Sequence, residues 1–428
     1  MTSAALDVAQ VTPEQRRRAT KAVVASSVGN ALEWFDIIVY ASFAVVISKL
    51  FFPEGKGVSG LLLTFGTFAL SYLIRPLGAM VIGSYSDRAG RKNALTLTIA
   101  LMTVGTAMMA FAPTAASVGT WAGLIILASR LLQGFSAGGE FGTSTAFLIE
   151  HASDRKAFYS SWQVATQGVA MFLASAFGFG LNTFLSQDSL ESWGWRVPFV
   201  FGMLIGPVGL YIRLKIDETP EFAATETIKS PVLTTFAHHL ERVLTAAATV
   251  GFASISVYLI LFMPTFAVTN LHLPAYAGYL GGIISGLVSL VGAPYVGKLA
   301  DRVGCVRVMT VAAVVAIVVG WPLFELLVAS PSVLTLTAVE VVLGVVLTLY
   351  FAPLPALLAQ LFPTAIRSTG MSVSYNIGVT IFGGFAPLIL TWLIASTGSL
   401  LAPSYYYVAV AIVSLVGLTL ARRRQGLQ

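Results

Sequence analysis

Seven ionisable side chains interrupt long apolar runs of this sequence, where each charged group costs about 2.5–3.5 kcal/mol on membrane-insertion scales. They are Glu33, Asp36, Arg75, Arg130, Glu140, Glu325 and Glu340. Seven unpaired charges would cost on the order of 20 kcal/mol, more than a marginally stable protein has in reserve. These groups must therefore pair, take up protons or line a wet cavity. Their chemistry is the binding of anions by arginine and the uptake of protons by carboxyl groups.

Two acids in the first run are candidates for proton binding. On a helix, Glu33 and Asp36 are three residues apart and share a face. We predict that Asp36 is the proton-coupling acid and that Arg130 is its partner. If Arg130 moves towards an anionic ligand, Asp36 loses its counter-charge and takes up a proton. A permanent ion pair that ties two helices together is the alternative. Glu33 is either a second proton site or a structural acid.

Arginine is the residue best suited to grip a carboxylate, because its planar fork binds both oxygens at once. We expect Arg75 to do so first and Arg130 second. Since Pro76 follows Arg75, the alternative role of Arg75 is to bond backbone carbonyls that the proline frees. Other polar side chains are expected to complete the site or to serve as contacts between helices: Glu140, Gln163, Gln167, Tyr258, Tyr350, Tyr375 and Asn376.

The elements that position these residues follow from composition. The chain has 428 residues, 56% of them hydrophobic and only 10% charged, with a mean hydropathy of +0.83. Soluble domains are about a quarter charged, so lipid must cover this surface. Twelve apolar runs are each long enough for a membrane helix. They span about 22–50, 59–83, 94–112, 119–149, 157–185, 194–214, 243–268, 276–297, 307–329, 332–360, 368–396 and 402–421.

The polar stretch 215–242 divides these runs into two six-helix bundles, 22–214 and 243–421, with terminal segments 1–21 and 422–428. With the N-terminus inside, cytoplasmic segments hold 20 of the 25 lysines and arginines and outer loops hold three. This bias predicts that both termini are cytoplasmic. The location expected is a bacterial-type inner membrane, with lipid around a monomer.

A repeated motif supports the two halves. Gly83-x-x-x-Asp87-Arg88-x-Gly90 recurs 214 residues later as Gly297-x-x-x-Asp301-Arg302-x-Gly304. The first copy continues with Arg91 and Lys92, and it resembles the signature loop of the major facilitator superfamily. In such a loop, an ionic contact made in one conformation and broken in another biases a rocking equilibrium. A positive loop without a gating role is the alternative. Cys305 and Val306 replace the basic pair in the second copy.

The whole chain resembles the metabolite:proton symporter family of that superfamily. The resemblance rests on residues 29–40 of the first run and 130–140 of the fourth, on Arg75-Pro76, and on 193–199 and 362–370. It implies an all-α membrane protein of twelve transmembrane helices that moves carboxylates, osmolytes or related metabolites by alternating access. The stretch 158–167 looks most like citrate and tricarballylate symporters, whereas 138–144 looks as much like 2-oxoglutarate permeases.

The function expected is therefore proton-coupled symport of a di- or tricarboxylate, citrate-like by resemblance. A symporter of an osmolyte or hydroaromatic acid, of the betaine/proline or shikimate type, is the alternative within transport. A membrane sensor that binds a metabolite without moving it is the alternative from another class. We expect no enzyme, cofactor, metal or nucleic-acid partner: the sequence has no P-loop, and its four histidines fall in predicted loops without a metal-ligand spacing.

Overall fold

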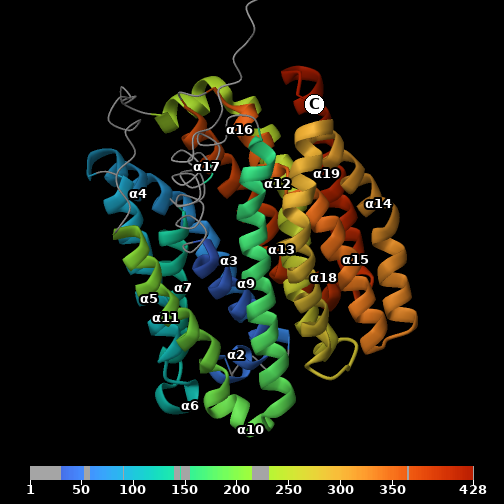
Figure 1. Cartoon of the computed structure of the whole chain (residues 1–428). Coiled ribbons are helices and arrows are strands. Elements are labelled where there is room, and N and C mark those ends of the chain that lie inside the picture. The colour runs from blue at the N-terminus through green and yellow to red at the C-terminus, as the bar shows by residue number, and fades with distance from the viewer. Residues whose placement is uncertain are drawn as a thin grey trace, which may run out of the picture.

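The structure is a computed structural model that describes residues 30–52, 58–89, 91–138, 145, 155–214, 231–363 and 366–427. Those residues form helices, turns and loops and contain no strand. Within lipid, backbone groups must be hydrogen-bonded inside their own segment, which is why the long apolar runs fold as helices. Figure 1 shows the long helices side by side in one elongated bundle.

The N-terminal bundle comprises the described residues from 30 to 214. Its first helix, Asn30–Ser42, bends by 68° into the next, which begins at Ala44. Its labelled helices are α2 (Ala44–Phe51), α3 (Val58–Leu73), α4 (Arg75–Ala89), α5 (Arg91–Ala110), α6 (Ala115–Val118), α7 (Trp121–Ala137), α9 (Lys156–Phe184), α10 (Gln187–Ser189) and α11 (Arg196–Leu214), with a π-helix η1 (Leu190–Gly194).

The C-terminal bundle comprises the described residues from 231 to 427. Its helices are α12 (Pro231–Thr269), α13 (Ala277–Val303), α14 (Cys305–Ala329), α15 (Val333–Phe351), α16 (Leu354–Leu361), α17 (Arg367–Val379), α18 (Ala386–Thr397) and α19 (Ala402–Gln425), with a π-helix η4 (Thr380–Gly384). Helix α12 begins inside the stretch predicted as a linker and has a kink at His239. His238 and His239 therefore lie in a helix, and the prediction of a loop there was wrong.

The all-α membrane fold is confirmed by helix length and composition. Eight described helices are long and apolar enough to cross a membrane, and the bent pair Asn30–Ser42 and α2 makes a ninth. The shorter apolar helices Thr96–Ala110 and Trp121–Ala137 match the third and fourth predicted runs. Both bundles have one end near the C-terminus, which we call the tail end, and an opposite end near α6 and α10, which we call the hairpin end (Figure 1).

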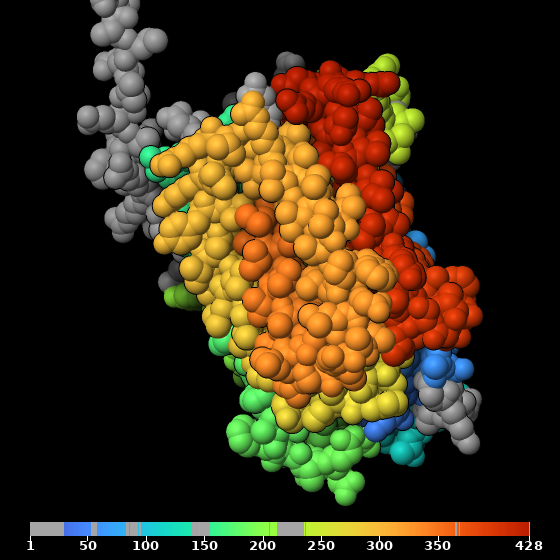
Figure 2. Space-filling model, turned by 90° about the vertical axis from the view of Figure 1, so that its right-hand side faces the viewer, coloured from blue at the N-terminus to red at the C-terminus, as the bar shows by residue number. Residues whose placement is uncertain are grey.

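The outer surface of the bundle is apolar. Helix α14 exposes Val311, Val318 and Trp321, and α19 exposes Ile412 and Val416. Figure 2 shows the face on which these two helices lie, coloured orange and red. A helix that faces lipid needs large apolar side chains along its outer surface, and these two helices have them.

The two bundles meet along α9 and α13, where glycines bring the backbones together. A Cβ atom on Gly168 would lie 2.6 Å from the backbone nitrogen of Leu290. One on Gly286 would lie 2.6 Å from the backbone nitrogen of Phe172. Small residues at such crossings let membrane helices approach closely. Nearer the hairpin end, the Tyr279 hydroxyl donates a hydrogen bond to the Ser42 carbonyl, with an oxygen–oxygen distance of 2.9 Å.

Candidate functional site

Asp36 lies in a polar cluster formed by three helices of the N-terminal bundle. Its side chain is fully buried. The Thr106 hydroxyl on α5 donates to its Oδ2 atom. The Gln133 amide on α7 donates to the same oxygen at 3.1 Å and to the Thr106 hydroxyl at 3.1 Å. Gly105 leaves room for Gln133, because a Cβ atom there would lie 2.6 Å from the Gln133 Cγ atom. Two donors therefore hold one carboxyl oxygen.

The other Asp36 oxygen, Oδ1, is buried without a hydrogen-bond partner. Arg130, its predicted partner, lies close enough to interact with Asp36 electrostatically. Its guanidinium stands 4.2 Å above the Tyr40 ring. The ion pairs within 4.0 Å among the described residues do not include Asp36 with Arg130. The structure thus brings the two groups near each other without direct pairing, and the coupling role of Asp36 stays a prediction.

Arg75 pairs with the other acid of the first helix. Its Nη2 atom lies 3.4 Å from the Glu33 Oε1 atom, and the Arg75 residue is 4% exposed. Its guanidinium stands 4.0 Å above the Tyr72 ring. The two buried arginines, 75 and 130, are near enough to repel each other. Arg75 Nε and Arg130 Nε and Nη2 have no hydrogen-bond partner. Buried donors without partners are rare in folded proteins, and these nitrogens are available to hydrogen-bond a ligand.

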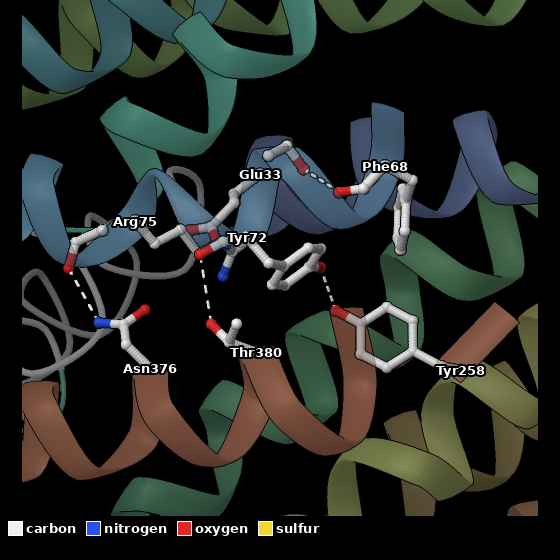
Figure 3. A network of polar contacts seen from close by, with 9 residues as sticks. Glu33, Phe68, Tyr72, Arg75, Tyr258, Asn376 and Thr380 are labelled. Atoms are coloured by element: carbon white, nitrogen blue, oxygen red, sulfur yellow. Dashed lines mark hydrogen bonds and ion pairs between the residues drawn. The ribbon is translucent and has the colours of Figure 1, made fainter. Parts of the chain in front are cut away.

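Residues of the C-terminal bundle approach Arg75 from the opposite side (Figure 3). The hydroxyls of Tyr72 and Tyr258 are hydrogen-bonded to each other across the two bundles. Thr380, in the π-helix η4, donates to the Tyr72 carbonyl at 3.2 Å. Tyr375 lies within electrostatic range of Arg75. Single-turn π-helices are frequent at functional sites, and this one is where the two bundles meet.

Aromatic rings from both bundles pack edge-to-face or tilted against one another on the hairpin side of Arg75. The Phe65 and Phe262 ring centroids are 6.0 Å apart, and those of Phe68 and Tyr258 are 5.8 Å apart. The rings of Tyr72 and Tyr258 are perpendicular, with centroids 5.7 Å apart. We call these five residues the aromatic barrier, because all of them are buried between α3 and α12.

The two predicted glutamines of α9 are both buried but differ in their contacts. The Gln163 Oε1 atom accepts a hydrogen bond from Thr145 at 2.9 Å. The Gln163 carbonyl accepts one from Asn30 at 3.2 Å. Both polar atoms of the Gln167 side chain are buried without a partner. Gln167 is therefore the better candidate for a hydrogen bond to a ligand.

Two other predicted site residues bond to backbone. Asn376 donates to the Gly138 carbonyl at 3.2 Å, which joins the bundles near the tail end. Tyr350 donates to the Thr249 carbonyl at 2.8 Å inside the C-terminal bundle, and no described contact joins it to either arginine. Glu140 lies outside the described residues. Of the remaining buried charges predicted, Glu340 is fully buried with both oxygens unpartnered, whereas Glu325 is exposed.

The second copy of the repeated motif joins the two bundles at the tail end. The Asp301 carboxylate accepts hydrogen bonds from the backbone nitrogens of Ala157 and Phe158, at 2.9 and 3.0 Å. These nitrogens belong to the first turn of α9, where a carboxylate is favoured by the helix dipole. Gly304 ends α13 with φ of 98°, which favours glycine. In the first copy, Gly90 and the side chains of Asp87, Arg88 and Arg91 lie outside the described part.

Four residues of this site were not predicted: Tyr40, Tyr72, Thr106 and Gln133. Three of them carry a signal in the sequence, because they lie three or four residues from a predicted charge on the same helix face. Tyr40 follows Asp36 by four, Tyr72 precedes Arg75 by three, and Gln133 follows Arg130 by three. Thr106 carries no such signal, because none of the predicted membrane charges lies within four residues of it in the sequence.

Comparison with known families identifies the fold and class of the protein. The family described as Major Facilitator Superfamily matches over residues 29–375 and 282–426. Two relatives are named as citrate-proton symporters. The one from Klebsiella pneumoniae is 35% identical over 407 residues, which are 94% of this chain and 92% of the relative. The one from Salmonella typhi is 33% identical over 413 residues, which are 95% of each chain.

A third relative, from Staphylococcus aureus, is named as a putative proline/betaine transporter and is 33% identical over 419 residues, 94% of this chain and 88% of the relative. Among solved structures, a proton:xylose symporter bound to 6-bromo-6-deoxy-D-glucose superposes with a TM-score of 0.76 at 14% identity, covering 95% of this chain and 96% of that one. A xylose transporter from E. coli in a partially occluded inward open conformation gives 0.74 at 13% identity, covering 95% and 97%. This likeness shows a common fold.

These matches run across nearly the whole chain, and the named relatives are transporters rather than enzymes. The chain therefore belongs to the major facilitator superfamily and is a multi-pass membrane transporter.

Proposed function

We propose that the chain is a proton-coupled symporter of a di- or tricarboxylate, citrate-like in its charge. The observation that carries the proposal is the pair of buried arginines, 75 and 130. Arg75 has one buried guanidinium nitrogen without a hydrogen-bond partner and Arg130 has two, and the two like charges lie near each other. A ligand with two carboxylates removes both defects at once, because each carboxylate accepts hydrogen bonds from one guanidinium.

The charges of the site supply a reason for coupling to protons. With both arginines and both acids ionised, the group of Glu33, Asp36, Arg75 and Arg130 is neutral. A dianion that engages the arginines leaves Glu33 and Asp36 as uncompensated buried charges, which is strongly unfavourable. Protonation of the acids restores neutrality. Asp36 is the coupling acid in this scheme, because its Oδ1 atom is already free to take a proton.

Citrate has a third carboxyl group, and this scheme has two arginines. We expect the third group to bind protonated or to be met by uncharged donors. The Gln167 amide and the hydroxyls of Tyr258 and Tyr375 are the candidates. Since uptake would then deliver further protons with the cargo, a proton gradient would drive it strongly.

Rocking of residues 22–214 against 243–421 would expose the arginines alternately to the two sides. The Tyr72–Tyr258 and Asp301 contacts join the bundles and would break in different phases of the cycle. The excess of basic residues in the predicted inner segments supports a cytoplasmic position for both termini. The hairpin end then faces outwards, and the chain acts as a monomer in the inner membrane.

A second candidate is a symporter of a zwitterionic osmolyte such as betaine or proline. The Glu33–Arg75 pair, 3.4 Å apart, offers an acid and a base side by side. The Tyr72 and Tyr258 rings provide faces of the kind that bind quaternary ammonium groups. The proline/betaine relative, at 33% identity, is nearly as similar as the citrate relatives.

Uptake by proteoliposomes with an imposed pH gradient, acidic outside, separates the two candidates. The panel is radiolabelled citrate, tricarballylate, 2-oxoglutarate, shikimate and betaine. We expect accumulation of citrate or tricarballylate, loss of that accumulation on addition of a protonophore, and no accumulation under a sodium gradient alone. Accumulation of betaine without any carboxylate would support the second candidate and overturn the first.

A further inference from the structure

A cavity of about 730 Å³ lies at the hairpin end, between the two bundles. The N-terminal bundle contributes α2 and α3 to its wall, and the C-terminal bundle contributes α12, the loop that follows it, and α18. Its polar lining residues are Ser48, Lys49, Thr265, Thr269, Asn270 and His272 together with Thr391. The volume is several times that of a small carboxylate, and of the residues described in the central site only Phe262, of the aromatic barrier, lines it.

The aromatic barrier separates this cavity from the central arginines. Phe262 lines the cavity, and its ring packs on Phe65. One turn further along α12, Tyr258 packs on Tyr72, and the Arg75 guanidinium stands 4.0 Å above the Tyr72 ring. Cargo that enters from the hairpin end would therefore meet the cavity first and Arg75 only after the barrier opens.

Two polar groups of the cavity could hold an anion: the Thr265 hydroxyl and the Lys49 amine. Thr265 is 1% exposed, and its buried hydroxyl has no hydrogen-bond partner. A buried hydroxyl without a partner is costly, so a structural role does not explain it. At the rim, the Lys49 amine lies 3.1 Å from the Glu191 Oε1 atom. The hydrogen bond from Gln187, and secondarily Lys49, lower the pKa of Glu191, so its carboxylate stays charged at neutral pH.

We propose that this cavity is an antechamber that binds one carboxylate of the incoming cargo before the aromatic barrier opens. The Lys49 amine and the Thr265 hydroxyl are the groups that hold it. Glu191 occupies Lys49 in the absence of cargo and competes with the cargo for it. The anionic nature of the cargo rests on the proposed function, whereas the site itself rests on the cavity and on these two side chains.

The competition gives opposite effects for two substitutions. Lys49→Gln removes the charge that attracts the cargo, whereas Glu191→Gln leaves the lysine and removes its competitor. Exposed ion pairs contribute little, so we expect a rise in KM of about two- to fivefold for the first and a fall of similar size for the second. The maximal rate should not change in either, because the central site is intact. Lys49→Arg should restore the wild-type KM.

Thr265→Val tests the inner end of the antechamber. If the hydroxyl were only a buried defect, valine would stabilise the protein and leave transport unchanged. If the hydroxyl binds cargo, KM should rise about threefold while the thermal midpoint of the purified protein stays equal or rises. The control is Arg424→Gln, which breaks an exposed ion pair of similar kind with Glu241, 2.8 Å apart, at the tail end. It should not alter KM.

The measurement is the initial rate of labelled citrate uptake by cells that express each variant, at about 20 and 200 mM salt. Wild-type KM should rise with salt and that of Lys49→Gln should not, because screening acts on the lysine. Unchanged KM in Lys49→Gln and Glu191→Gln, with normal wild-type uptake, would overturn the antechamber alone. A wild-type protein that takes up no carboxylate would overturn the proposed function, and the antechamber for anions with it.

Discussion

Asp36 and Arg75 do separate work at the site, and single substitutions distinguish the two roles. Asp36 accepts two hydrogen bonds at one oxygen and has the other oxygen free, whereas Arg75 pairs with Glu33 and stands over a tyrosine ring. Loss of an acid that carries the proton should impair accumulation driven by a pH gradient. Loss of an arginine that holds the cargo should raise the KM for uptake.

Asp36→Asn should abolish proton-driven accumulation but spare exchange of external for internal substrate. Asparagine keeps the hydrogen-bond acceptor for Thr106 and Gln133, so the fold and the cargo site remain, but it cannot take a proton. The measurement is the accumulation ratio in proteoliposomes with a pH gradient, which should fall to about one, together with counterflow at equal pH. Asp188→Asn, at the surface in α10, is the matched control. Wild-type accumulation in Asp36→Asn would disprove the coupling role.

Arg75→Lys should raise KM about tenfold or more, because lysine keeps the charge but loses the two-point grip on a carboxylate. The measurement is the concentration dependence of citrate uptake. Arg196→Lys is the matched control. The Arg196 guanidinium also stands over an aromatic ring, that of Trp195 at 4.3 Å, but it lies at the hairpin end, outside the central site. Equal KM values for the two variants would mean that Arg75 is a structural cation.

At the scale of elements, glycines set how closely the helices that carry these charges approach. Gly134 lies one turn after Arg130 on α7, and a Cβ atom there would lie 1.9 Å from the Ser71 carbonyl on α3. The same helix face continues to Gly138, where a Cβ would lie 2.0 Å from the Arg75 carbonyl. The position of both arginines therefore depends on backbone contact between α7 and the α3–α4 segment.

Gly134→Ala should destabilise the protein by about 1–3 kcal/mol, because an added methyl in a well-packed contact forces backbone shifts. The measurement is the thermal midpoint of the detergent-solubilised protein. Gly66→Ala, on α3, is the control, since a Cβ there meets nothing within 4 Å. This substitution should be neutral or slightly stabilising, because alanine favours helix more than glycine does. Similar midpoints for both variants would contradict the close packing.

The sequence predicted the helices and the charges well, and the contacts between helices poorly. Long apolar runs specify helices by themselves, because lipid allows only helices or closed barrels and continuous apolar runs lack the alternation of barrel strands. The burial of Asp36, Arg75 and Arg130 followed from their positions in these runs. The pairing of Arg75 with Glu33 depends on how α4 and the first helix rotate about their axes, and the hydrogen bonds from Thr106 and Gln133 to Asp36 depend on the rotation of α5 and α7. Side chains from all of these helices decide the rotations jointly, so no single run contains them.

At the scale of the whole molecule, Asp301 joins one bundle to the other through the first turn of α9. Asp301→Asn should weaken this contact, because the carboxylate loses its charge next to the helix dipole, which contributes about 0.3–1 kcal/mol. The balance between conformations should shift two- to fivefold towards the state open at the tail end. The measurement is the labelling rate of a Ser48→Cys reporter at the hairpin end, in a Cys305→Ser background, and the rate should fall.

Glu241→Gln is the control for that prediction, since Glu241 also takes part in an ion pair at the tail end, with Arg424. Both partners of that pair belong to the C-terminal bundle, so its loss should leave the labelling rate unchanged. A labelling rate that does not respond to Asp301→Asn would mean that the contact persists in both conformations.

The glycine contact between α9 and α13 has a consequence for speed. At Gly168 and Gly286 backbone meets backbone, so α9 and α13 can rotate or slide against each other there without lifting bulky groups over one another. We therefore expect these two contacts to add little to the activation barrier. The slow step of turnover would then depend on the contacts at the two ends of the molecule, and substitutions there would change the turnover rate at constant affinity.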